Sequence, residues 1–410
     1  MQHTGKLARA ELRDAKRATW WAGLFASLAL YALTARVYEH EPKRRRLDVS
    51  HDLRVDAGFE LNPRRGPAPM PPEHPDRYAA TAIGAPGALG GPLPGMSPEA
   101  RARFEEGRRA FTTAFTPEMG LGPYFEERSC ASCHFHPTVG GTAPGRLLVI
   151  SPGPPPEYET EHHPAHALPG WPPRTPPPGA SLSRPRPLYG LGLIEAVPDA
   201  VIIAGCDPED RDGDGVRGRP SIHDGVLNRF GAKAHQHTVR DFAQNALFDD
   251  MNVTSGRSLF HGQDRDDLLD PEVSEHFIDA LDAFVRSLAP PPRAGAHPVG
   301  EAVFTRVGCA SCHRPDLGPQ APGAYTDLCL HDMGPELDNH IRDKAAMGPD
   351  FRTPPLWGLR HQRSLLHDGR AQTPEQAIRA HGGEAAPARD RFLALSPSDR
   401  DALLAFLQTL

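Results

Sequence analysis

The pentapeptide Cys-Ala-Ser-Cys-His occurs twice in this chain of 410 residues, at residues 130–134 (the first motif) and 309–313 (the second motif). Two thiols at this spacing can add across the two vinyl groups of one haem, and the histidine that follows then lies under the iron as its proximal ligand. A zinc knuckle and a thioredoxin-like thiol pair are the alternatives, but one zinc ion needs four ligands at short spacings, and the motifs lie far apart. The sequence therefore predicts two covalently bound haem c groups.

Each motif supplies one iron ligand and two points of attachment. These residues are Cys130, Cys133 and His134 in the first motif and Cys309, Cys312 and His313 in the second. A phenylalanine stands five residues before each first cysteine, at Phe125 and Phe304. Residues 300–304 are predicted to belong to the first helix of a small cytochrome c module that turns into the haem loop at Gly308. We interpret the repeat as a loose internal duplication with one haem in each half.

Haem c is attached outside the cytoplasm, so the chain needs an export signal. Residues 19–35 form an uncharged run of 17 residues that follows five Lys or Arg residues, and its length fits both a short membrane span and a signal peptide. Cleavage after Ala32 or Ala35 would place Leu30 or Leu33 where a small residue is preferred. We therefore expect an uncleaved anchor in the inner membrane, with the body on the periplasmic face. A soluble periplasmic protein with the signal removed is the alternative.

The formal net charge of −7 conceals an asymmetry. Residues 1–46 carry ten Lys and Arg and four Asp and Glu, so the rest of the chain has a formal charge of −13. An acidic body argues against nucleic acid as a partner and fits a basic electron-transfer protein that docks by charge steering. Acidity that serves solubility alone is the alternative.

The composition divides the chain into four parts. Residues 1–46 are the predicted cytoplasmic tail and signal anchor, and residues 47–97, rich in Pro and Gly, are a tether. Residues 98–290 form an N-terminal haem c domain with a Pro-rich insert at residues 152–187, and residues 291–410 form a C-terminal cytochrome c domain. We therefore expect a mainly α fold of two cytochrome c-like haem domains with long Pro- and Gly-rich loops.

Helices are predicted where apolar periodicity follows a capping residue. One begins at Ser97, and others are expected at residues 241–248, 274–287 and 398–410. The insert holds 13 prolines, too many for regular structure, so we expect an extended loop there.

Two cysteines, Cys206 and Cys329, lie outside the motifs. In an oxidising compartment they can pair as a disulfide. Two buried free thiols are the alternative.

Several segments together resemble the dihaem c-type oxidoreductase family, whose members are often labelled Cys-x-x-Cys thiol oxidoreductases. These segments are FTPEMGLGPYFEERSCASCH, PLYGLGLIEAVPDA, DGDGVRGRP, YTDLCLHDMGP and FRTPPLWGLRHQRSLLHDGRAQTPEQAIRAHGGEA. The resemblance covers most of residues 100–410 and excludes the Pro-rich insert. The second half also resembles the bacterial dihaem cytochrome c peroxidases and their relatives that oxidise protein side chains.

The resemblance implies the distal ligand of the second haem. Aligning the peroxidases' His-x-Gly block on residues 367–369 places His381 at the ligand position, at the end of a short helix that begins after Thr373. Met333 and Met347 are rival ligands. Two histidines on one iron would make it low-spin and lower its potential relative to histidine and methionine.

The first haem needs an open sixth position and an acid/base group above it if it is to activate peroxide. Four histidines follow the first motif and could instead close that position: His136, His162, His163 and His166. In the peroxidases a Gln and then a Glu-Met-Gly run lie between the haems, and Gln244 and Asp250 fall in the equivalent stretch here. The resemblance therefore makes Gln244 and Asp250 the candidate catalytic residues, and an ordinary carboxylate at a helix end is the alternative for Asp250.

Two further features allow a functional and a structural interpretation. Asp210, Asp212 and Asp214 match the first half of an EF-hand loop, but the twelfth position is Ser221, so the loop is a candidate calcium site and otherwise a solvated acidic turn. Trp357 is expected beside the second haem, where its indole either relays electrons or only packs on the porphyrin.

The resemblance implies a periplasmic dihaem oxidoreductase like the cytochrome c peroxidases. The C-terminal haem would take electrons from a donor cytochrome or another periplasmic redox protein and pass them to the N-terminal haem, which would reduce hydrogen peroxide. A non-catalytic electron relay with two six-coordinate irons is one alternative, and oxidation of a protein side chain or thiol is another. The spin state of the first haem separates the relay from the enzymes.

Overall fold

The computed structural model describes residues 53–54, 60–61, 84–85, 87–153, 160–256, 268 and 270–410. The predicted membrane anchor at residues 19–35 lies outside these residues. No helix in the described part of the chain is long and apolar enough to cross a membrane. The residues Asp52–Leu410 group into one compact unit, so the predicted domain boundary near Pro290 stays a prediction.

The described residues are mainly helical, as the sequence predicts. Their α-helices are α2 (Pro98–Thr112), α3 (Cys130–Cys133), α4 (Leu191–Glu195), α5 (Asp199–Gly205), α6 (Val239–Met251), α7 (Glu275–Ser287), α8 (Pro298–Arg306), α9 (Pro374–Ala380), α10 (Ala386–Leu393) and α11 (Pro397–Leu407). Single 3₁₀ turns occur at η1 (Pro117–Met119), η2 (Cys309–Ser311), η3 (Leu359–His361) and η4 (Gly383–Ala385). The expected helices at residues 241–248, 274–287 and 398–410 correspond to α6, α7 and α11.

Side-chain caps explain where several helices begin. The Ser97 hydroxyl accepts a hydrogen bond from the Ala100 amide at 3.2 Å at the start of α2, as predicted. Thr238, Ser274 and Thr373 do the same for α6, α7 and α9. A side-chain oxygen at this position satisfies an amide that has no partner within the helix, so these residues determine where each helix begins.

The strands are short and form small sheets. They are β1 (Leu53–Arg54), β2 (Glu60–Leu61), β3 (Tyr124–Phe125), β4 (Leu148–Pro152), β5 (Thr160–His162), β6 (His166–Ala167), β7 (Ser181–Ser183), β8 (Ser221–His223), β9 (Val226–Asn228), β10 (Leu330–Asp332) and β11 (Asp350–Arg352). All the pairs are antiparallel: β1 with β2, β3 with β6, β8 with β9, β10 with β11, and β4 with β5 on one side and β7 on the other.

The Pro-rich insert has more structure than the sequence predicts. Three strands, β5, β6 and β7, lie within residues 152–187, so the expectation of an extended loop without regular structure is wrong for these segments. None of the three contains a proline, and their hydrogen-bonding partners come from β3 and β4, which begin outside the insert. The prolines therefore lie between the strands and do not prevent the strands from forming.

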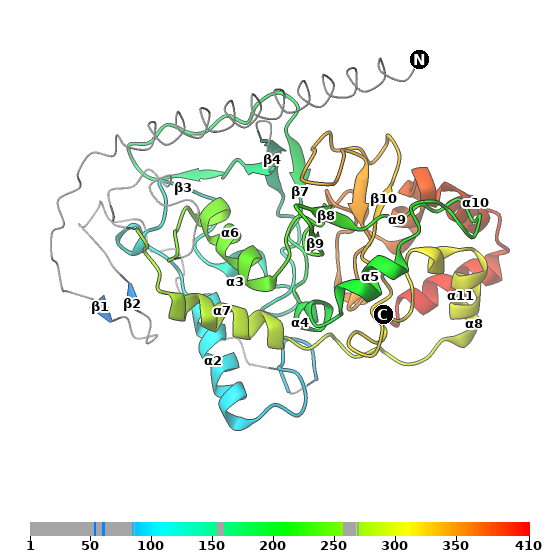
Figure 1. The fold of residues 1–410 in the computed structure, drawn as a ribbon, viewed down its shortest axis with the longest axis horizontal. Helices are drawn as coiled ribbons and strands as arrows, with labels where there is room; N and C mark the ends of the chain where they lie inside the picture. The colour runs from blue at the N-terminus through cyan, green and yellow to red at the C-terminus, as the bar shows by residue number, and fades with distance from the viewer. Residues whose placement is uncertain are drawn as a thin grey trace, which may run out of the picture. The chain divides into compact units, whose positions relative to one another are not determined.

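Two helix pairs carry the two hydrophobic cores. In the first pair Phe104 and Phe111 of α2 each pack on Phe284 of α7, with ring centroids 5.0 Å apart. Figure 1 shows α2 in cyan crossing the yellow-green α7. At the crossing a Cβ on Gly107 would lie 1.9 Å from the carbonyl oxygen of Ala280. Only glycine allows the two backbones to approach this closely.

The second pair, α8 and α11, repeats this arrangement. Phe304 packs on Phe406 with ring centroids 5.3 Å apart, and a Cβ on Gly300 would lie 2.0 Å from the carbonyl oxygen of Ala402. Phe125, in contrast, lies in strand β3 and is not the counterpart of Phe304. The two helix pairs therefore pack alike, whereas the two phenylalanines lie in different kinds of element, and the internal duplication stays a prediction.

Cys206 and Cys329 form a disulfide, with their Cα atoms 5.9 Å apart. It ties the end of α5 to the residue before β10. The bridge closes a sequence separation of 123 residues, for which the chain-entropy model gives a stabilisation of about 5 kcal/mol. The structure thus decides a question that the sequence left open.

We expect Gly300→Ala to lower the free energy of unfolding by about 1–3 kcal/mol, because the added methyl group meets a backbone oxygen that cannot move aside without shifting α11. Chemical unfolding of the holoprotein measures this loss. The control is Val299→Ala in the same helix, where the parent side chain is 62% exposed and the change should stay within about 0.5 kcal/mol. If both variants unfold like the parent, the close crossing of α8 and α11 is wrong.

Candidate functional site

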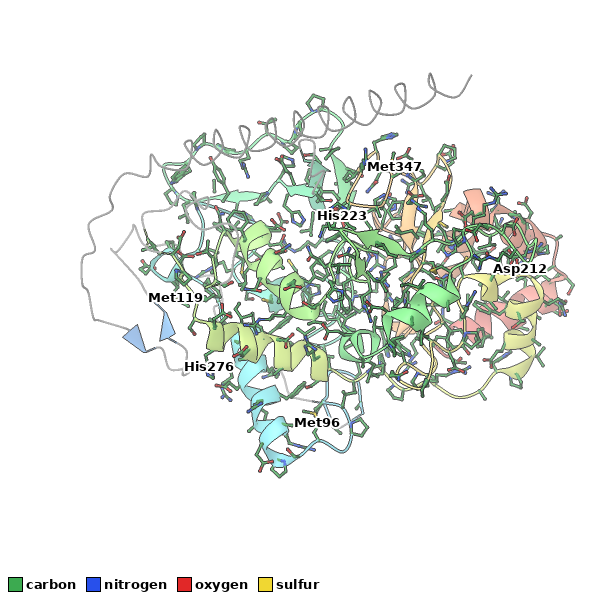
Figure 2. The ribbon with its side chains drawn as sticks, viewed as in Figure 1. Met96, Met119, Asp212, His223, His276 and Met347 are labelled. Atoms are coloured by element: carbon green, nitrogen blue, oxygen red, sulfur yellow. A yellow bond between two sulfur atoms is a disulfide. The ribbon has the colours of Figure 1, made fainter. Side chains whose placement is uncertain are left out.

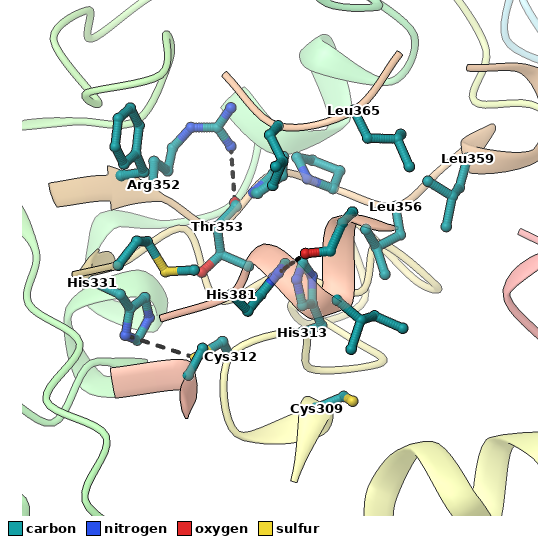
Figure 3. A pocket seen from close by; sticks show the side chains of 18 of the residues that line it. Cys309, Cys312, His313, His331, Arg352, Thr353, Leu356, Leu359, Leu365 and His381 are labelled. Carbon is teal, nitrogen blue, oxygen red and sulfur yellow. Dashed lines mark hydrogen bonds between the residues drawn. The ribbon is translucent and has the colours of Figure 1, made fainter. Parts of the chain in front are cut away.

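The second motif opens onto a cavity of about 440 Å³, which lies within the range of small-molecule and cofactor sites. Cys309, Cys312 and His313 line it from the motif side, and His381 lines it as well. Figure 3 shows these four residues around one space, with His381 close to His313. The rest of the lining is largely apolar and includes Leu337, Leu356, Leu359, Leu365 and Leu366.

Both histidines are held by main-chain carbonyls. The Nδ1 of His313 donates to the Tyr325 carbonyl at 3.0 Å, and the Nδ1 of His381 donates to the Ala377 carbonyl at 2.6 Å. Because a carbonyl can only accept, the hydrogen lies on Nδ1 and the Nε2 lone pair is available to a metal. Burial lowers the pKa of His313 to about 4, with a further contribution from His381, and burial also lowers the pKa of His381. Both rings are therefore neutral, which is the form that binds iron.

The rival ligands of the second haem lie differently. Met347 is 51% exposed and lies at the surface (Figure 2), so the structure contradicts it as an axial ligand. Met333 lines the cavity. His381 has the orientation that a ligand needs, and its role stays a prediction.

The first motif forms the short helix α3, which Ser129 caps at its N-terminus. The Ser129 hydroxyl accepts from the Ser132 amide at 3.2 Å, and this cap presents Cys130 and Cys133 one turn apart. The Nδ1 of His134 donates to the Gly141 carbonyl at 3.0 Å, as at the second motif. Because that carbonyl can only accept, the hydrogen lies on Nδ1, and burial lowers the pKa of His134, so the ring is neutral with its lone pair on Nε2.

Asp250, at the end of α6, lies beside the first motif and binds His162 of β5. The Nδ1 of His162 donates to the carboxylate at 2.8 Å. The charge of Asp250 also acts on Cys130, Cys133 and His134. Burial alone would lower the pKa of His162, but the ion pair with Asp250 outweighs it and raises the pKa to about 9. The pair is an imidazolium and a carboxylate at neutral pH.

The remaining candidates near the first motif have other partners. His163 bonds the Ser151 hydroxyl at 2.8 Å, and His166 lies against Phe125 with ring centroids 5.5 Å apart. Gln244 donates to the Ser255 hydroxyl at 2.8 Å. Residues six apart on a helix lie about 120° apart around its axis, so Gln244 does not share a face with Asp250. A catalytic role for Gln244 stays a prediction that this geometry does not favour.

The motif thiols are poorly suited to thiol redox chemistry. Burial raises the pKa of Cys130 and of Cys309 to about 12, whereas a thioredoxin-like cysteine reacts as a thiolate and needs a lowered pKa. The thiol-disulfide interpretation of the motifs is therefore disfavoured on electrostatic grounds.

His331 of β10 is a buried ionised residue that the sequence analysis missed. Its Nε2 donates to Asp327 at 2.9 Å and its Nδ1 donates to Glu384 at 2.8 Å. Burial opposes the charged form, but the two carboxylates raise the pKa of His331 well above its ordinary value. Glu384 follows His381 by three residues, so this ion cluster fixes the segment that carries His381 to β10. No local signal in the sequence marks the cluster, because its members come from two distant segments.

Trp357 belongs both to the first core, around α2 and α7, and to the lining of the cavity at the second motif. Its side chain is buried. A Cβ on Gly190 would lie 2.3 Å from the indole ring, so the glycine there leaves room for it. Trp357 thus lies beside the second motif, as predicted. Its role in relaying electrons stays a prediction.

The acidic loop brings its three carboxylates together. Oxygens of Asp210, Asp212 and Asp214 lie within 4.8 Å of one another on the surface, and Asp214 accepts a hydrogen bond from Ser311 of the second motif at 2.8 Å. Figure 2 shows Asp212 at the edge of the molecule. Calcium binding stays a prediction.

Comparisons with known proteins give the following similarities. The model of a family described as "Di-haem oxidoreductase, putative peroxidase" matches residues 181–410. No curated protein matches the chain. Among solved structures, the chain is similar to the diheme peroxidase BthA of Burkholderia thailandensis, at 18% identity and a TM-score of 0.41 over 88% of this chain and 92% of that one.

Two other solved structures have comparable scores. A MauG-like protein associated with microbial copper homeostasis shares 19% identity at a TM-score of 0.40, over 81% of this chain and 95% of that one. Hydrazine synthase of Kuenenia stuttgartiensis shares 14% identity at a TM-score of 0.41, over 84% of this chain and 100% of that one.

The family match covers more than half of the chain and includes the second motif, His381 and Asp250, while the first motif precedes it. A dihaem family implies two haems. The residues present fit that cofactor, since each motif pairs two cysteines with a histidine whose Nε2 is free. The chain belongs to the di-haem oxidoreductase (putative peroxidase) family.

Proposed function

We propose that this protein is a periplasmic dihaem c peroxidase. In this proposal the haems attached at the two motifs supply the redox chemistry, and electrons from a donor cytochrome or another periplasmic redox protein serve to reduce hydrogen peroxide at the first motif. The observation that carries the proposal is the ion pair of His162 and Asp250 beside that motif.

The ion pair offers both functions that peroxide reduction needs. Peroxide must lose a proton from one oxygen and receive a proton on the other, and a positioned acid/base group typically accelerates such a step by about 10²–10⁴-fold. Asp250 can accept a proton, and His162, with a pKa of about 9, carries one to donate at neutral pH. About a quarter of each side chain is accessible (24% and 28%), so a small substrate can reach the pair.

A non-catalytic electron relay is the second candidate function. It is favoured by one observation, since His162 uses only Nδ1 for Asp250 and leaves Nε2 free for a metal. The raised pKa argues against ligation, because an imidazolium has no lone pair to donate. The second site differs, since its two histidines are neutral. We therefore assign electron uptake to the second motif and peroxide chemistry to the first.

Three further assignments belong to the proposal. Trp357 would conduct electrons between the sites, since it borders the cavity and the core around α2 and α7. The predicted anchor in residues 1–46 would hold the protein on the periplasmic face of the inner membrane, where haem c is attached. Calcium at Asp210, Asp212 and Asp214 would stiffen the loop that bonds the second motif.

The first prediction concerns stoichiometry. Mass spectrometry of protein exported through a cytochrome c maturation system should show two covalently added haems, because each motif holds the complete attachment sequence. Cys133→Ala and Cys312→Ala should each disturb the attachment of one haem and leave the other. A holoprotein with a single haem, or with zinc at both motifs, contradicts the assignment.

The second prediction concerns the ligand His381. His381→Gly should convert the second haem from low-spin to high-spin and raise its potential, because a neutral imidazole donor is lost. Electron paramagnetic resonance and a redox titration measure the two effects. Met347→Leu is the control and should leave both unchanged, since that side chain is exposed. Identical spectra for His381→Gly and the parent would assign the iron to Met333 or another side chain.

The third prediction concerns the acid/base pair. Asp250→Asn should lower peroxide turnover by about 10²–10⁴-fold without changing the ligation of either haem. It should also shift the alkaline limb of the pH profile. In the parent, activity declines as the pH rises through about 9, where His162 loses its proton. Without the carboxylate the pKa of His162 falls, so the decline begins at lower pH.

Stopped-flow mixing of the half-reduced protein with peroxide gives the rates for this comparison. Asp279→Asn, a surface carboxylate of α7 that pairs with Arg240, is the charge-matched control and should behave as the parent. A parent protein whose first haem is six-coordinate, low-spin and silent toward peroxide would favour the relay instead.

A further inference from the structure

The cavity of the second motif contains positive charge that the proposed function has not used. Of the five arginines that line it, Arg389 pairs with Asp390, and Arg391 donates to the Val307 carbonyl. The other three are Arg184 and Arg186, which follow β7, and Arg352, the last residue of β11. Figure 3 shows Arg352 beside the cavity, bonded to Thr353. These residues come from distant parts of the chain, so the fold itself gathers three guanidinium groups at one space.

None of the three arginines has a carboxylate partner at ion-pair distance among the described residues. Arg184 donates to the Leu366 carbonyl at 2.7 Å and to the Gln362 amide oxygen at 2.9 Å, and its buried Nη1 has no partner there. Arg352 donates only to main-chain carbonyls, those of Gly231 and Thr353.

The side chain of Arg186 has no hydrogen-bonding or ion-pair partner within the part of the chain that the structure describes. It is the least constrained of the three, and its guanidinium borders the cavity.

These cations also repel one another. Burial lowers the pKa of Arg186 to about 10 and those of Arg184 and Arg352 to about 9, and the charge of Arg186 contributes to the shifts of the other two. Burial lowers the pKa of Lys233 to about 7, and the charge of Arg186 also contributes to this decrease. Asp368 raises the pKa of Arg184, and Asp327 raises that of Arg352, but both carboxylates lie beyond ion-pair distance. Buried like charges without counter-ions are costly, so the cavity is electrostatically incomplete.

The chemistry of the missing partner can be stated. A guanidinium group pairs with a carboxylate through two parallel hydrogen bonds and does so better than a lysine ammonium. Much of the rest of the lining is apolar, and the two cysteines of the second motif also border the cavity. Its two carboxylates, Asp214 and Glu384, bond Ser311 and His331 and no arginine of this group. Its ligand is therefore a largely apolar molecule that is anchored at the cysteines and carries carboxylates at another edge. A haem has this composition, since its two propionates are its only charged substituents.

We propose that Arg186, assisted by Arg184 and Arg352, binds the propionate carboxylates of the haem attached at Cys309 and Cys312. This inference rests on the proposed haem at the second motif but not on peroxidase activity. Arg186 is in a special position, because its main chain acts on the pKa of His134 in the first motif while its side chain borders the second cavity. Arg186 thus lies close to both sites. Its positive charge favours the reduced iron and therefore raises the midpoint potential of the second haem.

The test is a redox titration of the two-haem protein, followed by absorption spectroscopy. Arg186→Met should lower the midpoint potential of the second haem, because a positive charge that borders the cavity is lost. Arg186→Lys should restore most of that potential, because lysine returns the positive charge although it lacks the two parallel donors of a guanidinium group. Arg379→Met is the matched control: this arginine lies on α9, pairs with Glu375 and does not line the cavity, so the potential should stay at the parent value.

Two results would overturn the inference. One is an Arg186→Met protein that holds both haems at the parent potentials. The other is an equal fall in Arg186→Met and Arg186→Lys, which would indicate a loss of packing and not of charge. If Arg186→Met yields no holoprotein, Arg186→Gln removes the charge while keeping a polar side chain, and the same comparison applies. The titration needs no peroxide, so a parent without peroxidase activity would refute the proposed function and leave this test intact.

Discussion

The hydrogen bond from an imidazole Nδ1 to a main-chain carbonyl is the interaction on which both sites depend. His134, His313 and His381 all make it, to Gly141, Tyr325 and Ala377. Each bond fixes the tautomer and the orientation of its ring, so that Nε2 remains free. For His381 the acceptor is the carbonyl four residues earlier in its own helix, and the ring is therefore held by the end of α9.

Charge distinguishes the two sites. The second site combines neutral histidines with three arginines that have no carboxylate partner among the described residues, in a largely apolar cavity, which suits a bound anionic cofactor. The first site has a carboxylate and an imidazolium within hydrogen-bonding distance, which suits proton transfer. The two sites thus differ in charge although their motifs are identical, and the duplicated motif by itself does not provide this difference.

The scaffold holds these groups through close helix crossings and one covalent bond. Gly107 and Gly300 allow α2 to approach α7 and α8 to approach α11. The disulfide between Cys206 and Cys329 holds β10, and β10 carries His331, which binds Asp327 and Glu384. The segment with His381 is therefore attached to a covalently restrained strand, and this limits how far the ring can move from His313.

The sequence by itself determined the features that depend on neighbours in the chain. The two motifs predicted where haem would attach, capping residues such as Ser97 and Thr373 predicted helix starts, and the helix after Thr373 delivered His381 to the cavity. Only the tertiary structure decided the contacts between distant segments. It joined His162 to Asp250, paired the two remaining cysteines, turned Gln244 toward Ser255 and gathered Arg184, Arg186 and Arg352. Local spacing follows from backbone geometry, whereas these contacts depend on how separate segments pack, and no periodic pattern records that packing.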